Sequence, residues 1–134
     1  MRKLIKNVIT ADEAASMVMV GNKYHILPVM KKIKDTINKE VGPIDWDPPT
    51  YMLIEECRQH EWHVDTGSNN HMTWCDYGIS ILLNDKEESG KLEYRDGTKI
   101  DNYLHMAIHS SDVEHRVADN KGTRQVFLAF IRKA

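Results

Sequence analysis

Near residue 43 the sequence changes from a helical to an extended pattern, and this order constrains the fold more than any other feature. Before that point apolar residues recur at helical spacing, and after it short apolar or alternating runs are separated by turn residues. Helices followed by strands favour an α+β domain in which the helices pack on one sheet. A chain of 134 residues suits one hydrophobic core, so we expect a single domain over residues 1–134.

Residues 1–42 are expected to be helical. Thr10-x-x-Glu13 has the form of a capping box, which predicts a short helix from Ala11 to about Gly21. A second helix, with Pro28 in its first turn and Gly42 after its end, is indicated by five apolar residues three or four positions apart: Ile26, Met30, Ile33, Ile37 and Val41. Residues 43–49 are rich in proline and are expected to form a linker.

From Tyr51 onward the pattern predicts strands. Apolar or alternating runs occupy residues 51–55, 74–83, 91–94, 104–109 and 125–131. Asp96-Gly97, between two short extended runs, indicates a hairpin turn. Strands spaced this evenly are typical of a small barrel or a two-sheet sandwich.

Composition and charge exclude several classes of protein. A net charge of −2, without a cluster of Lys and Arg, disfavours nucleic-acid binding, because phosphate contacts need such a cluster. Two cysteines, Cys57 and Cys75, are too few for a disulfide scaffold, and Lys6 and Asp12 interrupt any signal-peptide core. No run of 18 apolar residues exists, so we expect a cytoplasmic protein without a membrane span, and its oligomeric state stays open.

A candidate metal site combines a His63-x-Asp65 motif with His115, which lies 50 residues further along the chain. Residues i and i+2 of an extended chain point to the same side, so His63 and Asp65 are expected to reach one ion. Two histidines and one carboxylate, with coordination positions left open, are typical of ferrous oxygenases. Arg124 starts an apolar strand nine residues later, and its guanidinium suits a buried carboxylate ligand, although it could instead cap the strand end.

Other histidines and the cysteines offer weaker alternatives. Cys57-x-x-His60-x-x-His63, with His71 and Cys75 downstream, has the residue types of a zinc site but lacks the usual spacing. Three histidines are expected in loops or on strand surfaces: His71, His105 and His109.

Taken together, the motifs in residues 51–131 resemble the prolyl 4-hydroxylase-like branch of the 2-oxoglutarate/Fe(II) dioxygenases. The family's pattern is matched by His63-x-Asp65, His115 and Arg124. The sequence between these residues is similar to the family too. Three further segments carry the likeness: the strand Ile79-Ser80-Ile81-Leu82-Leu83-Asn84, the hairpin Ser89-Gly90-Lys91-Leu92-Glu93-Tyr94, and the ending His115-x-Val117 through Gly122-x-Arg124.

The resemblance implies a double-stranded β-helix of the jelly-roll or cupin-like kind over residues 51–131, supported by the helices of residues 1–42. It implies that His63, Asp65 and His115 hold Fe(II) and that Arg124 pairs with the far carboxylate of 2-oxoglutarate. Two residues depart from the family, because Leu82 stands where many relatives have Tyr and Val126 where they often have Ser or Thr. Tyr77, in the same expected strand as Leu82, is the candidate replacement in binding 2-oxoglutarate.

Two hypotheses of function follow. The first is a 2-oxoglutarate-dependent Fe(II) dioxygenase that uses O2, with ascorbate as a candidate reductant, to hydroxylate a peptide or protein, prolyl residues included, or a small molecule. It would release succinate and CO2. The second is a metal-binding or structural β-domain of the same fold without catalysis. Four polar groups converging on an interior favour the enzyme, because each is costly there without a ligand or partner.

Overall fold

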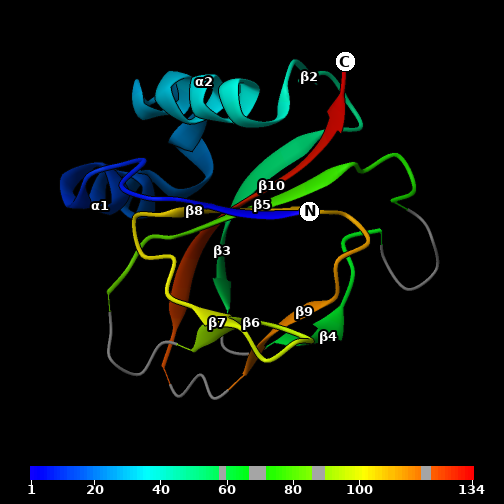
Figure 1. Cartoon of the computed structure of the whole chain (residues 1–134). Coiled ribbons are helices and arrows are strands. Elements are labelled where there is room, and N and C mark those ends of the chain that lie inside the picture. The colour runs from blue at the N-terminus through cyan, green and yellow to red at the C-terminus, as the bar shows by residue number, and fades with distance from the viewer. Residues whose placement is uncertain (58–59, 67–71, 86–89, 119–121) are drawn as a thin grey trace.

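The computed structural model describes residues 1–57, 60–66, 72–85, 90–118 and 122–134 and has three layers (Figure 1). Two α-helices cover one face of a six-stranded sheet, and a four-stranded sheet lies on its other side. The fold is therefore mostly strand, with curled antiparallel sheets of the jelly-roll kind and helices on one side, as the order of sequence patterns predicted. Within the described residues no helix has the length and apolarity needed to cross a bilayer.

The predicted helices are present with nearly the predicted bounds. Helix α1 covers Ala11–Val20 and starts with the capping box, in which Thr10 and Glu13 exchange hydrogen bonds. A 3₁₀ turn, η1, covers Gly21–Ile26, and helix α2 covers Val29–Val41 and ends at Gly42 with φ +84°. A glycine suits this position because it adopts positive φ without steric cost.

Two expectations for the N-terminal third are wrong. The chain opens with strand β1, Arg2–Ile5, which pairs with β8 at the edge of the six-stranded sheet. The expected linker contains β2, Ile44–Asp45, which pairs with the end of β10 through Arg132 and Lys133. Neither segment has strand periodicity of its own, so its partner strand supplies the backbone hydrogen bonds that make it extended.

The six-stranded sheet runs in the order β1-β8-β5-β10-β2, and β3 also pairs with β10. Its remaining strands are β3 (Tyr51–Cys57), β5 (Tyr77–Leu82), β8 (Met106–Ser110) and β10 (Arg124–Lys133). The four-stranded sheet has the order β4-β9-β6-β7, with bounds His60–His63, His115–Ala118, Lys91–Tyr94 and Lys99–Ile100. Strands β6 and β7 form the predicted hairpin, with Gly97 at φ +89° in its turn.

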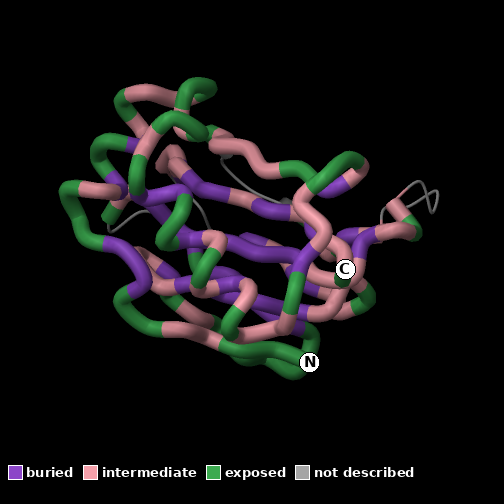
Figure 2. The backbone as a smooth tube through the Cα atoms, turned by 90° about the horizontal axis from the view of Figure 1, so that it is seen from above, coloured by how far each residue is buried: buried purple, intermediate pink, exposed green. Residues whose placement is uncertain are grey.

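Strand β10 of the six-stranded sheet has one face in the hydrophobic core and the other face at a cavity. Phe127, Ala129 and Ile131 point to the helices and join the main core, which also contains Met17, Ile33 and Ile37. The alternate residues of β10 point to the four-stranded sheet and line a cavity: Arg124, Val126, Leu128 and Phe130. Figure 2 shows the buried strands crossing the middle of the molecule, with exposed segments around them. The core on the helix side therefore supports the sheet, and the space between the sheets is left for a site.

Candidate metal centre and adjoining pocket

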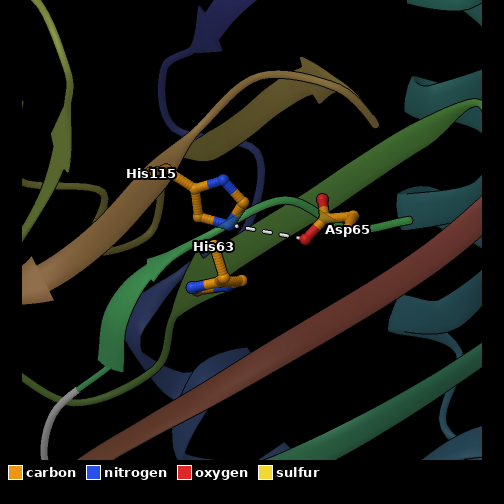
Figure 3. Close-up of side chains that lie close together, drawn as sticks. All are labelled: His63, Asp65 and His115. Carbon is orange, nitrogen blue, oxygen red and sulfur yellow. Dashed lines mark ion pairs between the residues drawn. The ribbon is translucent and has the colours of Figure 1, made fainter. Parts of the chain in front are cut away.

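The structure brings His63, Asp65 and His115 together between the two sheets. Their side-chain ligand atoms all lie within 4.8 Å of one another, although His115 lies 50 residues after Asp65 in the chain (Figure 3). His63 ends β4 and His115 begins β9, and the two are directly paired across the strands. Asp65 lies in a turn after β4 and not on the expected continuous strand, and its N–H donates to Ser111 O at 3.0 Å.

Both histidine rings are oriented by backbone carbonyls. His63 Nδ1 lies 2.6 Å from Glu61 O, and His115 Nδ1 lies 2.9 Å from Val113 O. A carbonyl only accepts, so each Nδ1 carries the proton, and Nε2 is the ring atom that could bind a metal. A hydrogen bond of this kind from Nδ1 commonly fixes the orientation of a metal-binding imidazole.

Asp65 is a buried carboxylate held by two histidines. Its Oδ2 lies 2.7 Å from His109 Nε2, and its Oδ1 lies 3.4 Å from His115 Nε2. Burial by itself would raise the pKa of Asp65, but the hydrogen bond from His109 and the nearby imidazole of His115 together outweigh burial and hold the pKa below its usual range. Asp65 is therefore an anion in the interior, which a cation between the three side chains would further stabilise.

The expectation that His109 lies in a loop or on a strand surface is wrong, because His109 is buried. Only 3% of it is exposed, and its Nδ1 lies 3.3 Å from the hydroxyl of the equally buried Tyr94. Burial lowers the pKa of His109, more than the hydrogen bond to Asp65 raises it. One signal was available: His109 continues the apolar run Met106-Ala107-Ile108, and strands buried on both faces are typically continuous in this way.

The cavity beside the three ligand candidates has a volume of about 220 Å³. Drug-sized ligands usually occupy roughly 300–1,000 Å³, so this space suits a smaller molecule. Arg124 lines it and is 3% exposed. The other walls are mainly apolar and include Leu92, Val117, Val126 and Leu128.

The structure does not bring Tyr77 to this cavity. Tyr77 and Gly78 are adjacent on β5, so they face opposite sides, and Gly78 faces the site. Tyr77 packs against the helix-side core, with Lys133 Nζ 5.5 Å from its ring centroid. Leu82 and Val126, the two departures from the family pattern, are buried partners in the β5–β10 register. In place of Tyr77, Ser80 is the residue of β5 with a hydroxyl group that lines the cavity.

The cysteine-based alternative finds no support in the described residues. Cys75 is buried and its thiol donates to Tyr77 O at 3.3 Å, and burial raises its pKa to about 12. Cys75 is also not part of the cluster of candidate metal ligands, which consists of His63, Asp65 and His115 in the described residues. The side chains of Cys57 and His60, and all of His71, lie outside the described parts of the structure. His105 is away from the candidate ligands and accepts from Asn7 N–H through Nδ1.

Comparison with known proteins gives a match in structure and none in sequence. No protein-family model and no curated protein matches the chain. A Pseudomonas putida prolyl-4-hydroxylase aligns with a TM-score of 0.71 and 12% identity, over 98% of this chain and 84% of that one. A viral collagen prolyl hydroxylase from Paramecium bursaria Chlorella virus-1, solved with 2-oxoglutarate, aligns with a TM-score of 0.69 and 13% identity. The alignment covers 99% of this chain and 96% of that one.

A third protein with this fold catalyses a different reaction. SnoN, a non-haem α-ketoglutarate-dependent epimerase from nogalamycin biosynthesis, aligns with a TM-score of 0.65 and 11% identity, over 99% of this chain and 78% of that one. The shared fold therefore extends beyond hydroxylases. In its fold the chain resembles the prolyl 4-hydroxylase-like 2-oxoglutarate/Fe(II) dioxygenases, which confirms the resemblance that its motifs predicted.

Proposed function

We propose that this chain is a 2-oxoglutarate-dependent Fe(II) dioxygenase built on a single domain with a double-stranded β-helix core. The observation that supports this most is the convergence of His63, Asp65 and His115 at a cavity that is also lined by the buried Arg124. Under this proposal the three residues hold the metal, and Arg124 holds the co-substrate. The similarity of fold to 2-oxoglutarate-dependent proteins supports the same assignment.

The donor set fits ferrous iron. One ligand atom each of His63, Asp65 and His115 lies within 4.8 Å of the other two, and Glu61 O and Val113 O hold the Nδ1 atoms of the two rings. Two histidines and one carboxylate leave coordination positions for the co-substrate and O2, which is the arrangement of the non-haem ferrous oxygenases. When bound, the metal would supply the activation of O2 that protein side chains lack.

The protein's own residues would bind the co-substrate and keep water out. Arg124 is always charged and forms bidentate bonds to carboxylates, so it suits the far carboxylate of 2-oxoglutarate. The apolar walls, which include Val126 and Leu128, lower the local dielectric constant and so strengthen that ion pair. Ser80 accepts from Asn102 Nδ2 at 3.1 Å, so its own hydroxyl proton is available to a ligand in the cavity.

The proposed reaction is hydroxylation of a peptide, a protein or a small molecule, with release of succinate and CO2. Prolyl hydroxylation is one form of it, supported by the two prolyl hydroxylases that share this fold. SnoN, an epimerase, has the same fold, so the assignment of a hydroxylated substrate rests on analogy with the two hydroxylases. We assign ascorbate the role of an accessory reductant and O2 that of the second co-substrate.

Anaerobic addition of Fe(II) and 2-oxoglutarate to metal-free protein tests the proposal. We expect a visible charge-transfer band that needs both components, and slow succinate formation when O2 and ascorbate are added. His63→Ala, Asp65→Ala and His115→Ala should each lose tight Fe(II) binding while the fold survives, because the helix-side core is separate from the site. The matched control is His25→Ala, which removes an exposed histidine far along the chain from the cavity.

A folded protein that binds iron and yet forms no succinate would favour the non-catalytic β-domain. Retention of metal in His115→Ala, combined with its loss in Cys75→Ser, would contradict the proposed ligand set and support the zinc alternative.

A further inference from the structure

We propose that His109 is a positioning residue that fixes which oxygen of Asp65 meets the metal. This inference rests on the proposed metal site, but its subject is a residue outside the three ligand candidates. His109 lies on β8 and Asp65 lies 44 positions earlier, in the turn after β4.

The two oxygens of Asp65 have different partners. Oδ2 is bonded to His109 Nε2 at 2.7 Å, whereas Oδ1 faces His115 Nε2 at 3.4 Å, the atom assigned to the metal. Because a hydrogen bond occupies Oδ2, the carboxylate offers Oδ1 as its free donor. Asp65 would therefore bind through one oxygen, which leaves room for a co-substrate that binds through two.

The direction of the hydrogen bond is fixed from the other side of the ring. Tyr94 Oη lies 3.3 Å from His109 Nδ1, and both residues are 3% exposed. An ionised carboxylate only accepts, so His109 Nε2 must carry the ring proton and Nδ1 must accept the proton of Tyr94. The result is a chain of donors from Tyr94 through His109 to Asp65, with each proton assigned by its neighbour.

The backbone of β5 blocks the carboxylate of Asp65 on one side. Gly78 is the direct cross-strand neighbour of His109 in the β5–β8 register. A Cβ at Gly78 would lie 1.7 Å from Asp65 Oδ2 and 2.7 Å from His109 Nε2. Asp65 therefore packs directly onto the backbone of β5, and His109 holds it there from the adjacent strand.

A histidine that merely fills the interior would need neither partner at these distances. The competing explanation is that His109 is a structural residue whose loss lowers stability alone. The two explanations differ in the effect of side-chain reach, because only a donor placed where Nε2 lies can restrain Oδ2.

Two amide substitutions separate the explanations. His109→Gln places an N–H close to the position of Nε2, whereas His109→Asn carries the same amide but reaches only to about the position of Nδ1. His109→Leu removes both hydrogen-bonding atoms. Each full-length variant is titrated with Co(II), and both the affinity and the visible ligand-field spectrum are recorded. Thermal unfolding of the metal-free proteins is measured in parallel, with His25→Gln as the control for substitution of an exposed histidine.

We expect His109→Asn and His109→Leu to lose about 10- to 100-fold in Co(II) affinity, the usual cost of removing a residue that hydrogen-bonds to a metal ligand. Their spectra should change, because Asp65 becomes free to bind through both oxygens or to turn away. His109→Gln should keep affinity and spectrum close to those of the unsubstituted protein, whatever its unfolding temperature.

Equal Co(II) affinities and spectra in the Gln and Asn variants would overturn the positioning role, even if the Leu variant does not fold. This failure differs from failure of the proposed function. In the latter case the unsubstituted protein would bind no Co(II), or His115→Ala would bind it equally well.

Discussion

Asn84 holds the backbone on both sides of Arg124. Its Nδ2 donates to Thr123 O at 2.9 Å, and its Oδ1 accepts from Gln125 N–H at 2.7 Å. Asn84 follows β5 and Arg124 begins the neighbouring strand β10, so one side chain closes the end of both strands. The backbone that carries the guanidinium is therefore fixed before any ligand binds. This lowers the conformational entropy that is lost on binding.

Asn84→Ala should weaken 2-oxoglutarate binding without weakening metal binding. The substitution leaves Thr123 O and Gln125 N–H without their partner, at a cost of about 1–3 kcal/mol, and frees the start of β10. We expect a several-fold loss of 2-oxoglutarate affinity in isothermal titration with Mn(II) in place of iron. Asn84→Asp, which keeps the acceptor for Gln125 N–H, should lose less. An equal fall in Mn(II) affinity would show that Asn84 acts on the whole site.

Arg124→Ala should reduce 2-oxoglutarate affinity by at least roughly tenfold, the cautious end of the cost of leaving one partner of a buried ion pair uncompensated. Mn(II) affinity should stay nearly unchanged, because Arg124 is not among the three clustered ligand candidates. Arg124→Lys should recover only part of the loss, since lysine keeps the charge without the planar fork. Wild-type affinity for 2-oxoglutarate in Arg124→Ala would mean that the arginine merely closes the strand end.

The helices and long strands could be predicted because their signals are local. The capping box of Thr10 and Glu13 marks a helix start within four residues, and β6 was predicted with its observed bounds. The short strands were missed because tertiary pairing makes them extended. Strand β1 contains Arg2 and Lys3, and it becomes a strand only through its pairing with β8.

The three ligand candidates and Arg124 were found through the spacing of motifs, and the structure brings them to one cavity. His109 and Gly78 were missed because they belong to no motif. Their importance comes from contacts with Asp65 that join β5 and β8 to the turn after β4. Local periodicity contains no information on such contacts between distant segments. Tyr77 was selected on the assumption of a register that β5 does not have.

Cys75 should be almost inert to alkylation in the native protein. Burial raises the pKa of its thiol to about 12, so the thiolate, the reactive form, is scarce at pH 8. In a Cys57→Ser background, iodoacetamide should modify Cys75 far more slowly before than after denaturation. Cys75→Ser should also leave the Co(II) spectrum unchanged. A thiolate-to-cobalt charge-transfer band that disappears in Cys75→Ser would revive the zinc alternative.

Gly78→Ala is the substitution that should damage the site most for the smallest change in volume. The added Cβ would lie 1.7 Å from Asp65 Oδ2, so the carboxylate must leave its position between His109 and His115. Overpacking of this kind typically costs about 1–3 kcal/mol of stability. We expect both a lower unfolding temperature and a loss of Co(II) affinity that exceeds the loss in His109→Leu, because Asp65 itself is displaced.

Ile81→Val is the matched control for this effect. Ile81 lies three residues after Gly78 on β5, and its side chain packs into the core on the helix side and does not line the cavity. Removing one buried methyl group there typically costs about 0.5–1.5 kcal/mol, so it lowers stability by a comparable amount. Because Ile81 packs on the opposite face of the sheet from Asp65, Co(II) affinity should stay at the wild-type value in Ile81→Val. If both variants lose Co(II) affinity in proportion to their loss of stability, the site depends on the rigidity of the sheet as a whole. If only Gly78→Ala loses Co(II) affinity, the contact between the Gly78 backbone and Asp65 positions the ligand.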